Sequence, residues 1–290
     1  ELPKVSSDTG YAASTMATDG TRVFAIFATG DLVALDFEGK QVWARNLGVP
    51  DNPYGHGSSL VVFEDILLVQ FDHKAGGALF GLDVKTGEPR WKTPRNFGAS
   101  WASPRLIEVG GKPQVVLSAD PVVAAYDPRT GKELWQVKCL EGGEVAPTPA
   151  FANGLLFAAA DHIRVVGIDV STQKVAWQQE EDLPGVSTPV VAGEFLIYGM
   201  DSGGIICRNA KTGKLLWLHE TDEGFYSSPL AAGDRVYLMD KTGLMHIFAA
   251  APEFKSLGKP KLGEEAVCTP AVIGNSIFYR AKNHLYRIGS

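Results

Sequence analysis

The sequence predicts an all-β protein: a seven-bladed β-propeller in which each blade is a four-stranded antiparallel sheet. Two series of repeated segments point to this fold, a hairpin that ends in Trp and a hydroxyl residue followed by Pro. Composition agrees, because 32 Gly and 17 Pro among 290 residues supply the turns that many short strands require. We call the strands of a blade A to D, from the innermost to the outermost.

The first repeated segment is a hairpin, seen in full as AYDPRTGKELW at Ala125–Trp135. It indicates a strand C, a tight turn at Asp127–Gly131 and a strand D that carries Trp135. We expect Gly131 to adopt a positive φ, Asp127 to accept hydrogen bonds from the turn, and the indole to lie between blades. Related hairpins end at Trp43, Trp91, Trp177 and Trp217. Their spacing of about 40 to 48 residues is an internal repeat.

The second repeated segment marks the start of strand A in each blade. Pro is tolerated at the first position of a strand, and the apolar residues that follow suit a strand buried on both faces. The seven starts are Thr15-Met16, Ser59-Leu60, Ser103-Pro104, Thr148-Pro149, Thr188-Pro189, Ser228-Pro229 and Thr269-Pro270. In the fifth repeat the four strands are expected over residues 187–193, 194–200, 204–210 and 214–220.

The ends of the chain favour a closed ring over a solenoid, which needs capping repeats. The last repeat stops after strand C, and Glu1–Val5 aligns with a strand D, so the N-terminal strand is expected to close the ring. We therefore predict one domain over residues 1–290, or eight blades if an N-terminal blade precedes this sequence. Two repeats depart from the pattern: Gln173 replaces Gly in the fourth, and Phe254 or Leu257 is expected to replace Trp in the sixth.

Composition also limits the partners. A net charge of −6 without a basic run argues against nucleic acid. No apolar run approaches the roughly 18 residues of a membrane span. The sequence begins at Glu1 without a leader, which is consistent with a leader removed upstream. Three distant cysteines give neither a disulfide framework nor a metal motif. We expect a monomer.

The pattern A-x-D-x-x-T-G-x-x-x-W at Ala125–Trp135 resembles the tryptophan-docking repeat of pyrroloquinoline quinone (PQQ)-like propellers, and the resemblance extends from Ala34 to Ile288. That group includes quinoprotein alcohol dehydrogenases, the lipoprotein of the outer-membrane β-barrel assembly machinery and other bacterial envelope proteins. Its members commonly have eight blades and are exported. The resemblance therefore implies a periplasmic or extracellular location in the cell envelope.

The chemistry of the quinoprotein dehydrogenases does not transfer to this sequence. Those enzymes carry two adjacent cysteines joined as a disulfide and a Ca²⁺ held by carboxylate and amide ligands. Here no two cysteines are adjacent, and no compact cluster offers the six to eight oxygens that Ca²⁺ takes. We predict no catalytic residue, no metal and no cofactor. PQQ with calcium, bound over Trp101 or a neighbour, is the alternative.

A binding site is expected on the face formed by the D–A and B–C connections. Aromatic, His and Asp residues gather there, and the Asp that recurs after strand B is expected to cap its own turn. Residues that interrupt the repeat are better candidates because the fold does not require them. They are His56, His73, Trp101, His162 and Tyr226. Three His from different blades converging on a transition metal is a less favoured possibility.

The sequence thus predicts a non-catalytic binding or scaffolding propeller that presents one loop-lined face to a protein segment or a small ligand. Two alternatives stay open: a PQQ-dependent quinoprotein oxidoreductase, and a propeller domain of a longer protein whose activity lies elsewhere.

Overall fold

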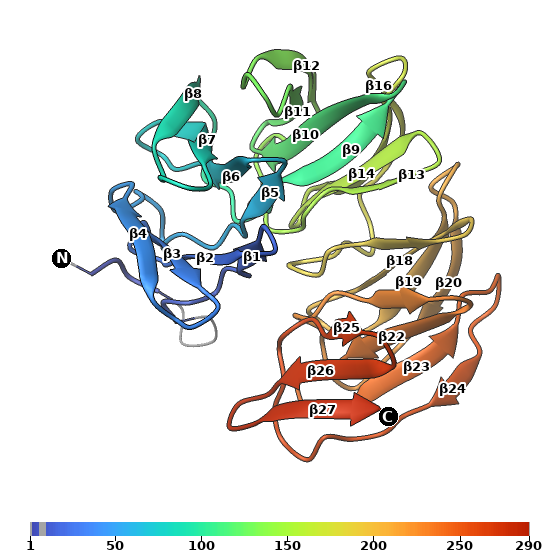
Figure 1. Cartoon of the computed structure of the whole chain (residues 1–290). Helices are drawn as coiled ribbons and strands as arrows, with labels where there is room; N and C mark the ends of the chain where they lie inside the picture. Colours follow the sequence, from blue (N-terminus) through green and yellow to red (C-terminus); the bar gives the residue numbers. More distant parts are fainter. Residues whose placement is uncertain (1, 6–9, 290) are drawn as a thin grey trace. The chain divides into compact units, whose positions relative to one another are not determined.

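Seven antiparallel β-sheets follow one another along the chain, each made of consecutive strands (Figure 1). We describe the protein from a computed structural model, which covers residues 2–5 and 10–289. Within that range there are 27 strands and no helix. The all-β β-propeller class is therefore confirmed, and we number the sheets as blades 1 to 7 in chain order. None of the described residues lies in a helix that could cross a membrane.

Blades 1 to 3 each have four strands. Blade 1 contains β1 (Ala17–Thr18), β2 (Arg22–Ile26), β3 (Asp31–Asp36) and β4 (Gln41–Asn46). Blade 2 contains β5 (Val61–Phe63), β6 (Ile66–Phe71), β7 (Gly77–Asp83) and β8 (Pro89–Arg95). Blade 3 contains β9 (Arg105–Val109), β10 (Lys112–Ala119), β11 (Val122–Tyr126) and β12 (Glu133–Lys138).

Blades 4 to 6 repeat this order, and blade 7 has three strands. Blade 4 contains β13 (Ala150–Ala152), β14 (Leu155–Ala160), β15 (Arg164–Asp169) and β16 (Lys174–Gln179). Blade 5 contains β17 (Val190–Ala192), β18 (Phe195–Gly199), β19 (Ile205–Asn209) and β20 (Leu215–His219). Blade 6 contains β21 (Leu230–Ala232), β22 (Arg235–Met239), β23 (Met245–Ala249) and β24 (Ser256–Gly258). Blade 7 contains β25 (Ala271–Ile273), β26 (Ser276–Arg280) and β27 (Leu285–Gly289).

The chain divides into two compact units, and each is described by itself. Unit 1 comprises Glu1–Pro149 with Val170–Lys174, and unit 2 comprises Ala150–Asp169 with Val175–Ser290. Unit 1 therefore holds blades 1 to 3 and the C–D turn of blade 4. Unit 2 holds the rest of blade 4 and blades 5 to 7. A single domain over residues 1–290 stays a prediction.

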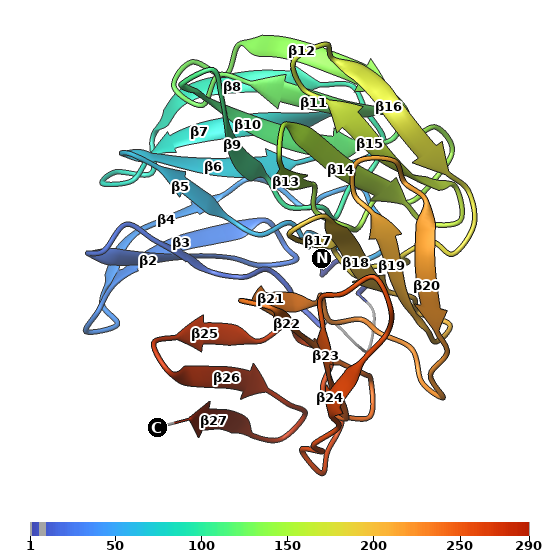
Figure 2. The ribbon, with the colours of Figure 1, turned by 90° about the vertical axis from the view of Figure 1, so that its right-hand side faces the viewer.

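Adjacent blades within a unit pack face to face through apolar side chains of strands B and C. In unit 1, Leu67 of β6 belongs to a cluster shared with blade 1, and Leu68 belongs to one shared with blade 3. In unit 2, Leu196 of β18 packs with blade 4 and Ile197 packs with blade 6. Figure 2 shows the ribbon of these blades from a second side. Because both faces of such a strand are buried, its sequence is a continuous apolar run rather than an alternating one.

The hydroxyl residue that starts each strand A joins neighbouring blades of unit 1. The backbone N–H of Thr15 donates to Ser59 Oγ at 3.0 Å, and that of Ser59 donates to Ser103 Oγ at 2.9 Å. The N–H of Ser103 in turn donates to Thr148 Oγ1 at 3.0 Å. Each hydroxyl therefore satisfies a backbone donor of the preceding repeat, which an apolar residue at this position could not do.

Unit 2 contains the same series of bonds. The N–H of Thr188 donates to Ser228 Oγ at 2.9 Å, and that of Ser228 donates to Thr269 Oγ1 at 2.8 Å. The sequence predicted where these residues lie but not this role. We call the bonds of both units the hydroxyl series.

The strand D tryptophans join blades at their outer ends, as expected. Trp43 lies against Gly87 in the C–D turn of blade 2, and its Nε1–H donates to Val84 O at 3.0 Å. Trp177 repeats the arrangement against blade 5, with its ring over Gly213. Its Nε1–H donates to Ala210 O at 2.9 Å. An indole thus rests where the next blade has no Cβ.

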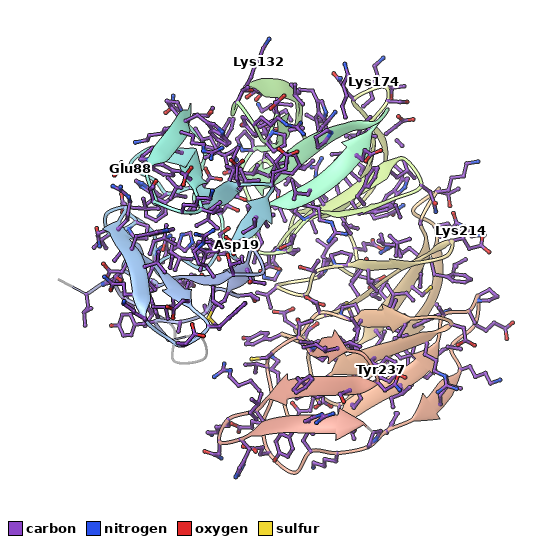
Figure 3. All side chains as sticks on the ribbon, in the orientation of Figure 1. Asp19, Glu88, Lys132, Lys174, Lys214 and Tyr237 are labelled. Carbon is purple, nitrogen blue, oxygen red and sulfur yellow. The ribbon has the colours of Figure 1, made fainter. Side chains whose placement is uncertain are left out.

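The turn of the best-conforming hairpin also behaves as predicted. Asp127 Oδ1 accepts hydrogen bonds from the N–H groups of Arg129 and Thr130 at 2.8 and 3.1 Å. Gly131 has a φ of +70°, and Trp91 of the preceding blade lies over it. Figure 3 marks this turn and three equivalent ones by the side chains of Lys132, Glu88, Lys174 and Lys214.

The fourth repeat keeps the turn geometry although it lacks the Gly. Gln173 occupies the position with a φ of +57°. Trp135, from the preceding blade, donates its Nε1–H to the Gln114 side chain of its own blade at 2.9 Å rather than to a carbonyl of the next one.

The prediction for the sixth repeat was wrong. Ile247 pairs with Gly258 at the position where Cys207 pairs with Trp217 in blade 5, so Gly258 takes the place of the Trp. Leu257 is exposed, and Phe254 packs on Trp217 of the preceding blade. The physical reason lies in the register. Leu257 falls in the shift between the two pairs of β24 with β23, where Leu216 lies in blade 5, so it does not take the position of the Trp.

The N-terminal segment does not form the expected strand. Residues 2–5 lie outside any strand, and Glu1 lies outside the described residues. Pro3 accounts for part of this difference, because its ring nitrogen cannot donate to a ladder. The Pro3 carbonyl instead accepts a hydrogen bond from the hydroxyl of Tyr11 at 3.3 Å.

We expect Gly213→Ala to lower the free energy of unfolding by about 2–4 kcal/mol. Gly213 has a φ of +72°, and an added Cβ would lie 2.5 Å from Trp177 Cε3. Gly233→Ala is the matched control, since Gly233 has a φ of +63° but nothing within 4 Å of its Cβ position. It should cost only the backbone strain of about 1 kcal/mol. Urea denaturation measures the free energy of unfolding of both variants. Equal losses would show that contact with Trp177 does not cause the larger loss expected for Gly213→Ala.

Candidate binding site

The predicted site residues of unit 1 lie on connections that the backbone joins side by side. The N–H of Ala28, in the B–C connection of blade 1, donates to Tyr11 O at 2.9 Å. The carbonyl of Ala28 accepts the N–H of His56, in the following D–A connection, at 3.1 Å. The N–H of Lys74, in the B–C connection of blade 2, donates to Asp51 O at 3.0 Å. The hydrogen bonds therefore fix these connections to one another.

Four aromatic residues occupy these connections, and we call them the aromatic strip: Tyr11, Phe27, Tyr54 and Trp101. Tyr11, Phe27 and Tyr54 are exposed to 41, 37 and 45%. The rings of Tyr54 and Trp101 are in contact, with centroids 5.4 Å apart. Trp101 is held in place because its Nε1–H donates to Gly55 O at 3.2 Å. The strip thus combines accessible rings with a fixed backbone.

Two of the predicted histidines pack on the same phenylalanine beneath the strip. His56 stacks on Phe71 with centroids 5.2 Å apart, and His73 meets that ring edge-on at 5.5 Å. His56 is buried and donates through Nε2 to Ser58 O at 2.8 Å. Burial lowers the pKa of His56 to about 4, against the opposing effect of that hydrogen bond. The imidazole is therefore neutral at pH 7 and serves as a packing residue.

The five predicted residues divide between the units. Unit 1 brings His56, His73 and Trp101 into one region. In unit 2, His162 is exposed, with Nε2 3.4 Å from Asp161 Oδ2. The ring of Tyr226 is covered by Lys241, whose Nζ lies 4.3 Å from the ring centroid and donates to a backbone carbonyl. Across residues 2–5 and 10–289, no group of three His, Cys, Asp or Glu side chains is placed to hold a metal ion.

The recurring Asp after strand B caps its own turn in blade 6, as expected. Asp240 Oδ1 accepts the N–H groups of Thr242 and Leu244 at 2.9 and 3.0 Å. Asp72 of blade 2 differs. It is buried, and both of its carboxylate oxygens accept from Arg95, at 2.8 and 3.0 Å.

A buried polar network extends from this ion pair into blade 3. Arg95 Nη1 donates to Tyr126 OH at 2.5 Å. Gln70 Nε2 donates to Asp72 Oδ2 at 2.7 Å and to Ser118 O at 3.0 Å. Burial alone would lower the pKa of the Arg95 guanidinium, but Asp72 outweighs it and raises that pKa. The network fixes the end of strand B on which Phe71 and His73 lie.

Sequence reasoning missed Phe27, Phe71, Gln70 and Arg95. Phe27 could have been found, because it is an aromatic residue in a B–C connection outside the repeat pattern. The other three lie within strands β6 and β8, where nothing in the local pattern separates them from core residues.

Four-stranded blades joined by docked tryptophans define the class of protein, a tryptophan-docking β-propeller of the PQQ-like type. The family can be stated more closely. A family model described as outer membrane protein assembly factor BamB matches residues 5–116, 119–199 and 184–253, and the chain belongs to that family.

Individual relatives agree with this assignment. The chain is 27% identical over 151 residues to outer membrane protein assembly factor BamB of Burkholderia pseudomallei, across 49% of the chain and 38% of that relative. The match therefore spans well under two thirds of the relative's length. The crystal structure of BamB from Moraxella catarrhalis is similar with a TM-score of 0.78 at 18% identity, over 96% of the chain and 82% of that structure.

Quinoprotein enzymes share the fold. A europium-containing methanol dehydrogenase superposes with a TM-score of 0.72 at 12% identity, over 94% of the chain and 72% of that structure. The quinohemoprotein alcohol dehydrogenase of Comamonas testosteroni superposes with a TM-score of 0.73 at 13% identity, over 96% of the chain and 63% of that structure. At these identities the likeness concerns the fold alone.

We expect Asp72→Asn to lower the free energy of unfolding by about 3–5 kcal/mol, because it leaves the buried Arg95 without a counter-charge. Asp65→Asn is the control: Asp65 pairs with Arg90 at 2.5 Å, but 55% of its side chain is exposed. Arg90 keeps its pair with Asp83 at 2.6 Å, and water solvates these exposed side chains, so the loss should be far smaller. Urea denaturation measures both variants, and a similar small loss for each would exclude a role for the buried pair in stability.

We expect the protein to lose stability as the pH falls from about 6.5 to about 4, in part through His56. The unfolded imidazole titrates near its ordinary pKa of about 6.5, whereas the folded one titrates at about 4. Between these values only the unfolded state gains the proton, so acid favours unfolding by up to about 3 kcal/mol. His56→Gln should lessen the difference between urea unfolding at pH 7.5 and at pH 4.5. His162 is exposed, so His162→Gln should leave that difference unchanged. Equal behaviour of the two variants would contradict the role of His56 in the loss of stability in acid.

Proposed function

We propose that this chain is a non-catalytic binding propeller of the bacterial cell envelope that presents the aromatic strip to a segment of a partner protein. The observation that carries the proposal is the exposure of Tyr11, Phe27 and Tyr54 on connections that hydrogen bonds hold side by side. Large rings fixed on a rigid support bury much area on binding and lose little conformational entropy, which is why aromatic residues are frequent at the centres of interfaces.

The layer beneath the strip supports a preformed site. His56 and His73 both pack on Phe71. Asp72, next to His73 in the chain, is held by Arg95. These contacts order the connections before a partner binds, so binding loses little conformational entropy there.

Family membership supports the choice of partner. The matching family and the relative from Burkholderia pseudomallei are outer membrane protein assembly factors by name, and the similar structure from Moraxella catarrhalis is named BamB. We therefore propose a periplasmic location and a partner among the proteins that assemble outer-membrane proteins. The chain would act there as a monomer, alone or as the propeller of a longer protein.

The residues around Trp101 do not fit a quinone with calcium. Of the nearby carboxylates, Asp72 is held by Arg95, and Asp120 Oδ1 accepts the N–H of Gly142 at 3.1 Å. Calcium takes six to eight oxygen ligands, and these side chains do not converge to supply them. The quinoprotein alternative therefore receives no support beyond the shared fold.

A photo-reactive amino acid at position 54 should crosslink to a protein of the outer-membrane assembly machinery in envelopes of the source bacterium. Phe37, 63% exposed in the C–D turn of blade 1, is the matched control and should give at least about fivefold less adduct. Tyr54→Ala should weaken binding to the isolated partner about tenfold, as for an aromatic interface residue, with little change in Tm. Trp101→Ala is the second variant, and both its binding to the isolated partner and its Tm are measured.

Two results would overturn the proposal. Equal adducts at positions 54 and 37 would remove the aromatic strip as the binding surface. A stoichiometric complex with added PQQ and Ca²⁺, showing a bound-quinone spectrum and dye-linked alcohol oxidation, would establish an oxidoreductase instead.

A further inference from the structure

The outer segment of blade 6, residues 250–260, is held against blade 5 by two side chains of β20. Trp217 Nε1–H donates to Ala251 O at 2.9 Å, and the Trp217 ring lies 5.3 Å from that of Phe254. His219 stacks on the Phe254 ring, with ring centroids 3.7 Å apart and planes inclined by 10°. One of the two β20 side chains that contact this segment is therefore titratable.

The segment is joined to its own blade by a short ladder and a few further contacts. Strand β24 has three residues, and its register with β23 contains two pairs, Ile247 with Gly258 and Phe248 with Ser256. Beyond that ladder, the N–H of Ala250 donates to Asp234 O at 2.9 Å, the N–H of Met245 donates to Pro260 O at 2.8 Å, and the Phe254 ring lies 5.6 Å from that of Phe248. The contacts with β20 add to these and join the segment to blade 5.

Protonation of His219 is unfavourable where it lies. Its Nε2 is buried and has no hydrogen-bond partner among the described residues. Burial lowers the pKa of His219, and the charges of Lys259 and His246 lower it further. Lys259 follows β24 and His246 lies on β23, so both belong to the blade that His219 must hold.

His246 behaves similarly. It is buried, its Nε2 lies 3.2 Å from Asp240 Oδ2, and its Nδ1 has no partner in the described part of the chain. Burial lowers the pKa of His246 against the hydrogen bond and charge of Asp240, and Lys259 adds to the lowering. The fully buried Phe225 meets its ring edge-on at 5.4 Å and carries no charge.

The free-energy contributions at His219 favour the neutral imidazole. A cationic imidazole over the Phe254 ring would gain about 0.5–1 kcal/mol from the aromatic face. A buried N–H without an acceptor costs about 1–3 kcal/mol, and repulsion from Lys259 adds to that cost. The unfavourable contributions are larger.

We propose that His219, whose protonation Lys259 and His246 oppose, forms an acid-sensitive contact that holds residues 250–260 on blade 5 when its ring is neutral and loosens on protonation. In the released state His219 reaches water and takes up its proton without penalty. Acid therefore opens this segment locally, while tryptophan docking and the hydroxyl series hold the remaining blades of the unit.

Hydrogen exchange of the full chain, followed by mass spectrometry at pH 7.5 and pH 5.5 and corrected for intrinsic rates, tests the proposal. Opening of residues 250–260 should increase by at most about tenfold at the lower pH, because pH 5.5 lies one unit below the ordinary imidazole pKa of about 6.5 at which the released ring titrates. The equivalent hairpin of blade 5, residues 209–217, is the internal reference and should change far less.

Variants separate this contact from general acid unfolding. His219→Phe retains a ring over Phe254 and should remove at least half of the pH effect. Lys259→Met should lessen it, whereas Lys255→Met, an exposed lysine of the same segment, should not. An undiminished effect in His219→Phe would overturn the proposal, as would equal acid opening of residues 209–217.

Discussion

An indole ring needs a place on the next sheet where no Cβ stands, and the outer part of this propeller is arranged around that requirement. Gly87, Gly131 and Gly213 provide the place in the C–D turns that receive Trp43, Trp91 and Trp177. The residue opposite each tryptophan on its own strand C is also small: Ala34, Gly81, Ala125, Gly167 or Cys207. A register shift follows this pair in blades 1, 2, 3 and 5 and aims strand D at the neighbouring sheet.

The two ends of the interface between blades 1 and 2 are joined by different chemistry. At the inner end the backbone N–H of Thr15 donates to Ser59 Oγ. At the outer end the Trp43 indole provides buried area and one bond to Val84 O. The indole lies outside the D–A and B–C connections, and the hydroxyl series uses only residues just before strand A, so the rest of those connections can vary. In unit 1 the aromatic strip lies on these variable connections.

The sequence could predict the elements whose cause is local or periodic. Asp127 and Gly131 act within a few residues of one another, and their turn geometry is as predicted. Trp135 differs, because its Nε1–H donates to Gln114 of its own blade rather than to a carbonyl of the next one. The site was predictable only in part. His56, His73 and Trp101 could be selected because they interrupt the repeat, but their common partner Phe71 is indistinguishable in sequence from a core residue.

Long-range partners account for what the sequence could not reveal. Asp72 and Arg95 lie 23 positions apart, and only the fold places their charges together away from water. Lys241 covers Tyr226 for the same kind of reason, since the lysine belongs to the next B–C connection. Gly258 stands where Phe254 or Leu257 was expected, because the pairing of β24 with β23, which the sequence alone does not reveal, places Leu257 in a register shift.

Gly258 has a consequence for how the protein unfolds. In a repeat protein each interface between repeats contributes its own free energy to stability, and repeats unfold together only where that free energy is large. Blades 6 and 7 share a small apolar cluster around Met245 and Tyr279 and the bond from Ser228 to Thr269, but among the described residues no docked indole joins them. This interface therefore has one of the two joints present between blades 5 and 6, and it should separate before that one.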